Sequence, residues 1–259
     1  MKNARQRNIL AILQKESFLS VRELSMRLFA SQPTIRRDLD FLEKNGYVRR
    51  SHGGVTAADG RVNTPVPFRR GIMTKEKTAI CELAATLLQS EQLIFIDAST
   101  TAFFLSHFLR REQKITVVTN GITLCRTLSE KQVQVFSTGG RPIRESEAFV
   151  GSIAERTVGG FFADLMFFSS SSLGEDGVIS DYSEEETALR LAMRQRARKL
   201  VFLCDSRKFA SRSAFEVLSL REVDVLVTDQ PIAAVMAEAC GLSLTVQTKG
   251  AVMYEKQLV

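Results

Sequence analysis

Residues 31–44 constrain the fold more than any other segment, because they carry one narrow apolar stripe in an otherwise polar run. Ile35, Leu39 and Leu42 recur at spacings of four and three residues, which places them on one face of an α-helix. Ser31 is a favourable N-cap for this helix, and an Asn-Gly pair ends it. The segment therefore predicts a helix with one buried face and an opposite face that is free to contact a partner.

The exposed face of this helix holds two adjacent arginines, Arg36 and Arg37, near its N-terminus. An arginine can donate two hydrogen bonds to guanine, and the N-terminal part of a recognition helix is the part that meets base edges. Downstream, a short strand, a Ser-His-Gly-Gly turn and the returning Val55 have the form of a wing. The helix and the wing predict contact with double-stranded DNA through Ser31, Gln32, Thr34, Arg36, Arg37, Arg49, Arg50 and His52.

Two more helices are predicted upstream of the recognition helix. Ile9 to Leu13 form the apolar side of the first, and Ser20 with Glu23 forms a capping box that starts the second. We therefore predict a DNA-binding domain over residues 1–57. A three-helix interaction module with a charged surface is the competing interpretation of the same pattern.

The net charge of +6 is concentrated in this first domain. Residues 1–60 contain eleven Lys and Arg against six Asp and Glu, whereas the rest of the chain is balanced to within one charge. A basic small domain joined to a neutral large one favours a polyanion as the partner of the small one. A solvated basic face is the alternative, and charge alone does not separate the two.

The four cysteines, Cys81, Cys125, Cys204 and Cys240, are far apart, and each lies in an apolar run. They predict reduced core residues of a cytoplasmic protein rather than disulfides or zinc ligands. Cysteines and histidines this scattered do not form a ligand cluster, so we expect no metal and no cofactor. No apolar stretch is long enough to span a membrane.

Residues 34–54, with the sequence TIRRDLDFLEKNGYVRRSHGG, resemble the signature of the DeoR-type bacterial transcriptional regulators. The resemblance implies that the first domain is a winged helix-turn-helix. It also implies a structural role for Asp38, in a bridge to an arginine. The matching positions are Thr34, Arg36, Arg37, Asp38, Leu39, Gly46, Arg50, His52, Gly53 and Gly54.

A linker is predicted over residues 58–74, where two prolines stand among small and polar residues. Beyond it, near-continuous apolar strands between helices predict an α/β domain over residues 75–259, with a mostly parallel sheet covered on both faces. The predicted strands are 93–97, 115–120, 133–138, 165–169, 200–205, 223–229 and 242–247. The predicted helices lie near 75–89, 100–111, 121–130, 184–198 and 230–240.

Polar residues follow several of these strands, and in an open α/β sheet a ligand binds outside the carboxyl ends of the strands. Ser99, Thr100 and Thr101 would open a helix, where hydroxyls and free N–H groups favour an anion. Each of these polar residues is alternatively only a cap or a turn former. The candidate effector-binding residues are Asp97, Ser99, Thr100, Thr101, Asn120, Gly139, Gly140, Glu186, Asp205 and Lys208.

The second domain also resembles the DeoR-type pattern, over most of residues 75–230. The sensor domain of that family is similar in fold to sugar-phosphate isomerases. The resemblance implies that the second domain binds a phosphorylated sugar or a related metabolite, and Glu186 is a candidate on this ground.

The leading hypothesis is a cytoplasmic regulator, a repressor of a carbohydrate-metabolism operon, with a small-molecule effector, no catalytic residues and no membrane partner. A homo-oligomer is expected because paired heads match repeated half-sites on operator DNA. One alternative is an isomerase-like enzyme fused to a DNA-binding head, with Glu186, Asp205 and Lys208 as candidates for proton abstraction. In another, the second domain is only an assembly platform.

Overall fold

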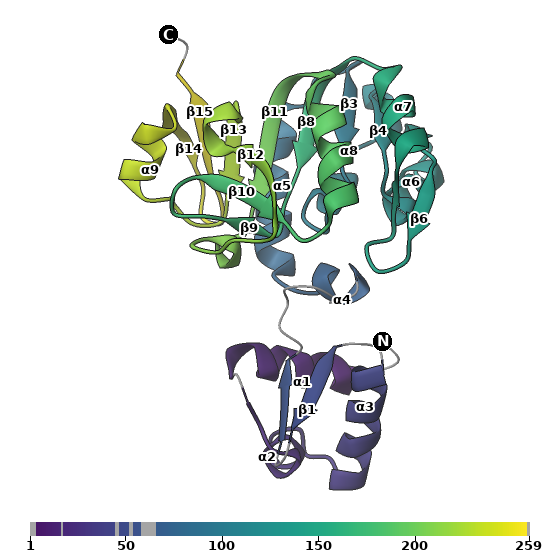
Figure 1. The fold of residues 1–259 in the computed structure, drawn as a ribbon, viewed down its shortest axis with the longest axis vertical. Coiled ribbons are helices and arrows are strands. Elements are labelled where there is room, and N and C mark those ends of the chain that lie inside the picture. Colours follow the sequence, from purple (N-terminus) through teal and green to yellow (C-terminus); the bar gives the residue numbers. More distant parts are fainter. Residues whose placement is uncertain (1–3, 17, 45–46, 52–53, 58–65, 258–259) are drawn as a thin grey trace. The chain divides into compact units, whose positions relative to one another are not determined.

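The structure is a computed structural model, which describes residues 4–16, 18–44, 47–51, 54–57 and 66–257. The chain divides into two compact units, Met1–Ile72 and Met73–Val259, both drawn in Figure 1. The division falls inside the segment predicted as a linker, residues 58–74.

The N-terminal unit contains three helices followed by a two-stranded antiparallel wing (Figure 1). As predicted, the Ser20 hydroxyl accepts the N–H of Glu23, and the Glu23 carboxylate accepts the N–H of Ser20 at 2.7 Å. A short helix also forms inside the predicted linker, where its proline falls in the first helical turn and is tolerated. The elements are α1 (Ala4–Lys15), α2 (Val21–Arg27), α3 (Gln32–Lys44), β1 (Val48–Ser51), β2 (Gly54–Ala57) and α4 (Val66–Arg70).

The core of this unit joins the three helices to the wing. On α3 the stripe of Ile35, Leu39 and Leu42 is completely buried, as the spacing predicts. Leu19, just before α2, pairs with Val55 of β2 through two backbone hydrogen bonds of 3.0 and 2.8 Å. The wing is therefore fixed to the helices by backbone bonds as well as by side-chain packing.

The C-terminal unit is built on an eight-stranded sheet with the order β14-β15-β13-β11-β8-β3-β4-β5. The strands from β13 to β5 are parallel to one another, and β15 is antiparallel to both of its neighbours, β13 and β14, so the mostly parallel sheet is confirmed. The strands are β3 (Leu93–Ile96), β4 (Thr116–Thr119), β5 (Gln134–Ser137), β8 (Ala163–Phe168), β11 (Ala197–Cys204), β13 (Val225–Thr228), β14 (Leu242–Gln247) and β15 (Val252–Lys256).

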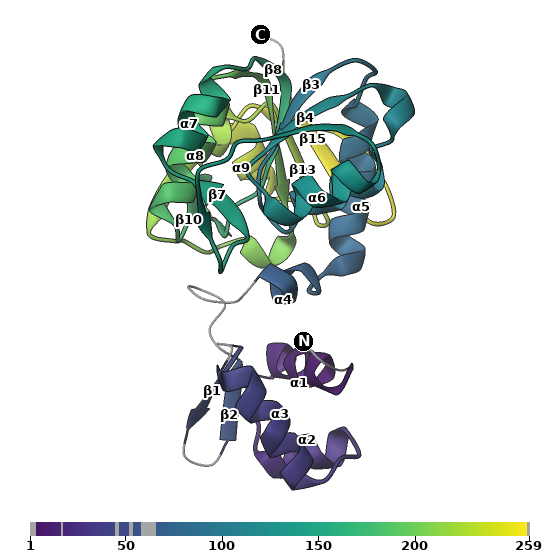
Figure 2. The ribbon, with the colours of Figure 1, turned by 90° about the vertical axis from the view of Figure 1, so that its right-hand side faces the viewer.

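Helices cover both faces of this sheet, as Figure 2 shows for α5 and α6 on one side and α7 and α8 on the other. Neighbouring residues of a strand point to opposite faces, so Ile94 and Ile96 join the core under α5 while Phe95 joins the core under α8. Burial on both faces explains why the strands are apolar without alternation. The helices are α5 (Thr74–Ala84), α6 (Ile122–Glu130), α7 (Ser152–Gly159), α8 (Glu184–Arg194) and α9 (Ala234–Ala239).

Several short elements differ from the sequence-based expectation. The α-helix expected near 100–111 is a 3₁₀ helix over residues 102–107, in a run of aromatic residues that have low helix propensity. Strands β6 and β7 form a hairpin, and β12-β10-β9 form a separate antiparallel sheet. The unpredicted elements are α7, β15, β6 (Arg141–Ile143), β7 (Ala148–Val150), β9 (Ser172–Leu173), β10 (Val178–Asp181) and β12 (Phe215–Ser219); the 3₁₀ helices are Ala85–Leu87, Ala102–His107, Arg111–Gln113, Ser206–Lys208 and Leu220–Glu222.

Candidate DNA interface and effector site

The exposed face of α3 carries the predicted arginine pair. Arg36 and Arg37 are both exposed, and neither guanidinium forms an ion pair or a hydrogen bond with any residue that the structure describes. Ser31 and Gln32, at the start of the helix, are also exposed. Unpaired charges on an exposed helix face are available to phosphates and base edges.

The first turn of α3 is held by its predicted cap. The Ser31 hydroxyl accepts the backbone N–H of Thr34 at 3.4 Å and lies 2.8 Å from the Thr34 hydroxyl. Capping of this kind satisfies one of the free N–H groups at a helix start. Ser31 and Thr34 therefore have a structural role in addition to the DNA contact predicted for them.

Asp38 of α3 forms hydrogen bonds with two residues of α1. Its carboxylate is buried and accepts hydrogen bonds from Nε of Arg5 at 2.5 Å and from the Gln6 amide at 3.0 Å. The bridge to an arginine that the resemblance implies is thus confirmed. Because Arg36 and Arg37 precede Asp38 directly, this anchor fixes the rotation of α3 that keeps the arginine pair outside.

Replacing Asp38 with alanine is expected to lower the free energy of unfolding of the N-terminal unit by about 1.5–3 kcal/mol, because Arg5 and Gln6 lose their acceptor. Asp40→Ala is the control, since Asp40 is exposed and its surface ion pair contributes less than about 1 kcal/mol. Urea denaturation measures both variants. Equal stability of the two variants would contradict the anchoring role of Asp38.

Arg50, in wing strand β1, is turned back onto α3. Its guanidinium lies 2.7 Å from Oδ1 of Asp40 and 3.5 Å from Oε2 of Glu43. It also donates a 2.8 Å hydrogen bond to the backbone oxygen of Arg36. Arg50 therefore holds the wing against the recognition helix, and the phosphate contact predicted for it would compete with two carboxylates.

The turn of the wing is described only in part. The side chain of Arg49 and the whole of His52 lie outside the described residues, so their DNA contacts stay predictions. Gly54 opens β2, and a Cβ there would lie 2.6 Å from the backbone oxygen of Leu19. Glycine is required at this position because the wing backbone passes too close to the preceding loop for a side chain.

The strand order of the large sheet defines where a ligand would bind the C-terminal unit. The chain proceeds from β3 to β4 and β5 on one side, and later to β8, β11 and β13 on the other. The order thus reverses between β3 and β8, and such a switch point opens a crevice beyond the carboxyl ends of the strands. Asp97 follows β3 and Ser169 follows β8, and the Ser169 N–H lies 3.4 Å from Oδ2 of Asp97.

Two lysines meet the loop that follows β3. Lys77 of α5 is only 2% exposed and donates a hydrogen bond to the Thr100 hydroxyl at 3.2 Å. Lys208 donates to the hydroxyls of Thr101 at 3.2 Å and Ser169 at 2.7 Å. Ammonium groups with little access to water favour an anion beside them.

Asp205, directly after β11, is the acid closest to these lysines. Its carboxylate is buried, 3.4 Å from Nζ of Lys208 and 3.3 Å from Nε of Arg207. Burial by itself would raise the pKa of Asp205, but Lys208, Arg207 and Lys77 outweigh burial and hold the pKa below its ordinary value. Asp205 is therefore ionised and sets one negative charge against three positive ones.

Arg190 of α8 organises the acidic part of the site. Its buried guanidinium lies 2.7 Å from Asp97, 2.8 Å from Asp181 and 3.5 Å from Glu186. Burial would lower the pKa of Arg190, but the three carboxylates raise it above the ordinary value, so Arg190 keeps its charge. This network joins the end of β3 to β10 and α8.

Three predicted effector residues lie outside these charge networks. The Asn120 amide donates to the backbone oxygen of Phe149 at 3.2 Å, and its own side-chain oxygen is buried without a hydrogen-bond partner in the described chain. Gly140 has φ of 107°, and a Cβ there would lie 2.6 Å from the backbone oxygen of Val150, so the path of the chain requires glycine. Gly139 precedes it, also at positive φ. The remaining seven predicted residues belong to these charge networks, either through an ion pair or through a hydrogen bond in the loop after β3. They are Asp97, Ser99, Thr100, Thr101, Glu186, Asp205 and Lys208.

Comparison with known families covers both units. The DeoR-like helix-turn-helix domain matches residues 5–61, and the DeoR C terminal sensor domain matches residues 72–230. The chain belongs to the DeoR family of transcriptional regulators. The first match covers the winged unit of this DeoR-family regulator, and the second covers the strands of its sheet from β3 to β13.

Individual relatives match most of this DeoR-family chain. YulB, an uncharacterised HTH-type regulator of Bacillus subtilis strain 168, is 33% identical and covers 87% of the chain and 88% of the relative. The glycerol-3-phosphate regulon repressor of Escherichia coli K12 is 27% identical and covers 89% of the chain and 92% of the relative. Among solved structures, ribose 5-phosphate isomerase A of Methanocaldococcus jannaschii is similar at a TM-score of 0.41, with 10% identity, and the match covers 71% of this chain and 79% of that chain.

Five residues of the charge networks of this DeoR-family regulator are absent from the predicted site: Lys77, Ser169, Asp181, Arg190 and Arg207. Lys77 has a readable signal, because it stands on the apolar stripe of α5 with Ile80, where a charge needs a partner. Arg207 is readable as well, because it stands two residues after Asp205 in the polar run that follows β11. The other three have no local signal, because their contacts depend on how β8, β10 and α8 return to the end of β3.

Within the described part of this regulator, no group of three or more His, Cys, Asp or Glu side chains could hold a metal ion. None of the helices described there is long and apolar enough to cross a membrane.

Proposed function

We propose that this chain is a cytoplasmic repressor of a carbohydrate-metabolism operon, controlled by a phosphorylated sugar or a related metabolite and acting as a homo-oligomer. The DNA-binding part of this proposal rests on Arg36 and Arg37, which are exposed and form no ion pair with any described residue, and which the bridge between Asp38 and Arg5 holds outward. The relative named as a glycerol-3-phosphate regulon repressor supports the effector half, because its similarity extends through both units.

The charge of the effector site favours a phosphate group. Lys77, Lys208 and Arg207 bring three positive charges close to the loop after β3, and Asp205 neutralises one of them. Cations that outnumber the acid beside them favour an anionic ligand, and a phosphate monoester can accept several charge-assisted hydrogen bonds from such groups. The carboxylates bound to Arg190 lie nearby at the end of β3 and can accept hydrogen bonds from sugar hydroxyls.

Helix α5 contains Lys77 of this site and begins, in sequence, just after the boundary between the two units. Lys77 lies in its first turn, and the backbone N–H of Lys77 donates to the oxygen of Met73 at 2.8 Å. Met73 is the first residue of the C-terminal unit and has φ of 52°, a left-handed conformation that methionine rarely adopts. A ligand bonded to Lys77 would therefore act on the residue where the chain passes between units, and through it on operator affinity.

Lys208→Met is expected to weaken binding of the sugar phosphate by about 1.5–3 kcal/mol, because it removes a charged donor to the phosphate. Isothermal titration calorimetry with a panel of phosphorylated sugars measures this loss. Lys114→Met is the control, since Lys114 is exposed and pairs with Glu91 on the surface. Equal affinity of both variants for the ligand would place the ligand elsewhere.

Operator affinity with and without the bound sugar phosphate tests the proposal as a whole. An effector must prefer one of the two DNA-binding states, so we expect the operator Kd to change by roughly 5–150-fold. If no ligand of the C-terminal unit changes the operator Kd, that unit is an assembly platform and not a sensor.

Isomerase activity is not part of the proposal. Proton abstraction needs a carboxylate or an amine that is free to take the proton. Asp205 is paired with Lys208, and Glu186 lies against Arg190, so the candidate bases are engaged in ion pairs. Turnover of a bound sugar phosphate would contradict this assignment.

A further inference from the structure

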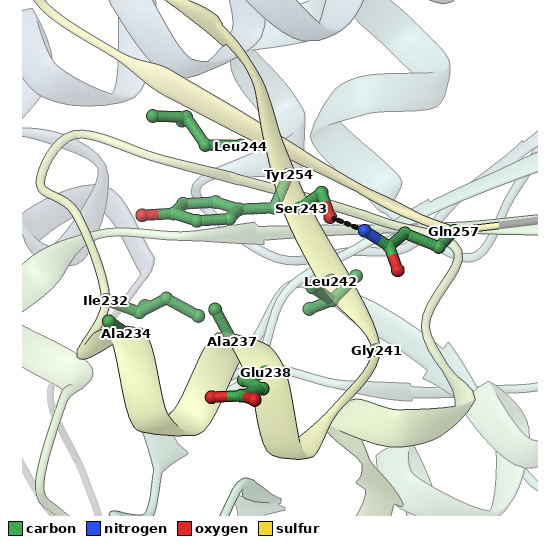
Figure 3. A pocket seen from close by; sticks show the side chains of 10 residues that line it. All are labelled: Ile232, Ala234, Ala237, Glu238, Gly241, Leu242, Ser243, Leu244, Tyr254 and Gln257. Carbon is green, nitrogen blue, oxygen red and sulfur yellow. Dashed lines mark hydrogen bonds between the residues drawn. The ribbon is translucent and has the colours of Figure 1, made fainter.

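An apolar surface lies at the β14 end of the large sheet, beyond the strands whose ends carry the charge networks. It is formed by α9, the edge strand β14 and its neighbour β15, around an open hollow of about 400 Å³ (Figure 3). Tyr254 and Leu244 lie on one side of the hollow, and Ile232 and Ala237 on the other. Glu238 is the one charged residue among the ten that line the hollow. We name this apolar surface the α9–β14 surface.

The α9–β14 surface leaves large apolar side chains in contact with water. Val235 on α9 is 79% exposed, and Leu244 and Val246 on β14 are 49% and 41% exposed. No strand of the described chain pairs with the outer side of β14, which ends the sheet. Natural edge strands are usually guarded by charges or proline, and the sequence LSLTVQ of β14 contains neither. An unguarded apolar edge of this kind marks an interaction surface.

We propose that a second copy of this chain covers the α9–β14 surface, with the two β14 strands antiparallel around a two-fold axis. A two-fold interface requires one patch to be complementary to itself. Leu244 is half exposed and also lines the hollow, so each copy offers both an apolar side chain and apolar walls that can receive one. Because β14 carries no charge, pairing it with itself brings no like charges together.

The charges flanking β14 fit the antiparallel arrangement. Glu238 lies four residues before β14, in α9, and Lys249 lies two residues after it. Both are exposed, and neither forms an ion pair within the part of the chain that the structure describes. In an antiparallel pair the start of one strand faces the end of the other, so Glu238 of one copy comes near the partner's Lys249. Opposite charges thus meet at both ends of the interface.

Pairing through this surface also suits the proposed function, although the interface does not depend on it. One winged head contacts one half-site of an operator. Two heads joined by their C-terminal units contact two half-sites, which raises the affinity without any new contact to DNA.

Sedimentation velocity of the full chain, without DNA or effector, tests the proposal. The wild type is expected to self-associate. Leu244→Arg is expected to raise the dissociation constant of the dimer at least about 30-fold, because the two-fold symmetry places one arginine from each copy in an apolar interface. Ile153→Arg is the control, since Ile153 is 56% exposed on α7 and is expected to leave association unchanged. A monomeric wild type, or wild-type association of the Leu244 variant, would overturn the proposal.

Charge reversal provides a second test. Both positions are exposed, and circular dichroism checks that each variant is folded. Glu238→Lys and Lys249→Glu are each expected to raise the dissociation constant about 3–10-fold, and the double variant is expected to restore the wild-type value. Further weakening in the double variant would contradict the antiparallel pairing. Wild-type association of the Leu244 variant would leave the proposed function standing, whereas a monomeric wild type would remove the homo-oligomer from it. Neither test measures operator or effector binding, so failure of those measurements leaves this interface standing.

Discussion

Arg190→Met is expected to lower the free energy of unfolding of the C-terminal unit by about 3–5 kcal/mol. Arg190 is the shared cation of Asp97, Asp181 and Glu186, whose side chains are 2%, 11% and 14% exposed. Its removal leaves these carboxylates close together with little water around them. The expected loss is therefore that of uncompensated buried charge, which is larger than the loss of a surface ion pair.

Arg194 provides a matched control on the same helix. It pairs with Glu222, and both side chains are 38% exposed, so Arg194→Met is expected to cost less than about 1 kcal/mol. Urea denaturation followed by circular dichroism compares the two variants in the full chain. An Arg190 variant as stable as the Arg194 variant would show that the three carboxylates do not depend on one cation.

Arg37→Ala is expected to cost about 1–3 kcal/mol of operator binding and to relax the choice of base at one position. The reason is that Arg37 is exposed near the start of α3 and is not engaged by any described residue, so its donors are available to a guanine. Arg36→Ala is expected to have an effect in the same range if it contacts a base, and a smaller effect that is uniform across sequences if it contacts phosphate.

The matched control for the arginine variants is Lys44→Ala, because Lys44 is exposed at the opposite end of α3 and carries the same charge. Fluorescence anisotropy with the operator and with a base-substituted operator measures affinity and specificity together. If Arg37→Ala and Lys44→Ala bind both duplexes alike, α3 is not the element that reads the sequence.

The DNA-binding unit follows closely from the sequence because its information is local. Ile35, Leu39 and Leu42 are spaced for one helix face, and that face is buried in the structure. The capping box of Ser20 and Glu23 involves residues only three apart, so no knowledge of the remaining fold is needed to find it.

Arg50 shows where local information ends even in this unit. Its position in a basic turn predicts a phosphate contact, but its ion pairs reach back to Asp40 and Glu43 of α3. These contacts depend on how the wing returns to the helix, and the pattern of charges along the chain does not contain that information.

The effector site is less predictable because its contacts join distant segments. Arg190 bonds to Asp97, ninety-three residues earlier, and Lys208 bonds to Thr101, one hundred and seven residues earlier. Strand ends are readable from the sequence, but the reversal of strand order between β3 and β8 is not, and this reversal brings the charges together. Short strands such as Ser172–Leu173 contain too few residues to show any period.

Selection of binding sites from a random library of double-stranded DNA measures whether α3 reads base sequence. The wild-type chain is expected to enrich a guanine-containing half-site, because no described residue engages the guanidinium groups of Arg36 and Arg37, which can then donate to base edges. The double variant Arg36→Ala, Arg37→Ala is expected to lose this motif while it retains the thermal stability of the wild type. A wild type that enriches no sequence, or a double variant that enriches the same motif, would contradict the account.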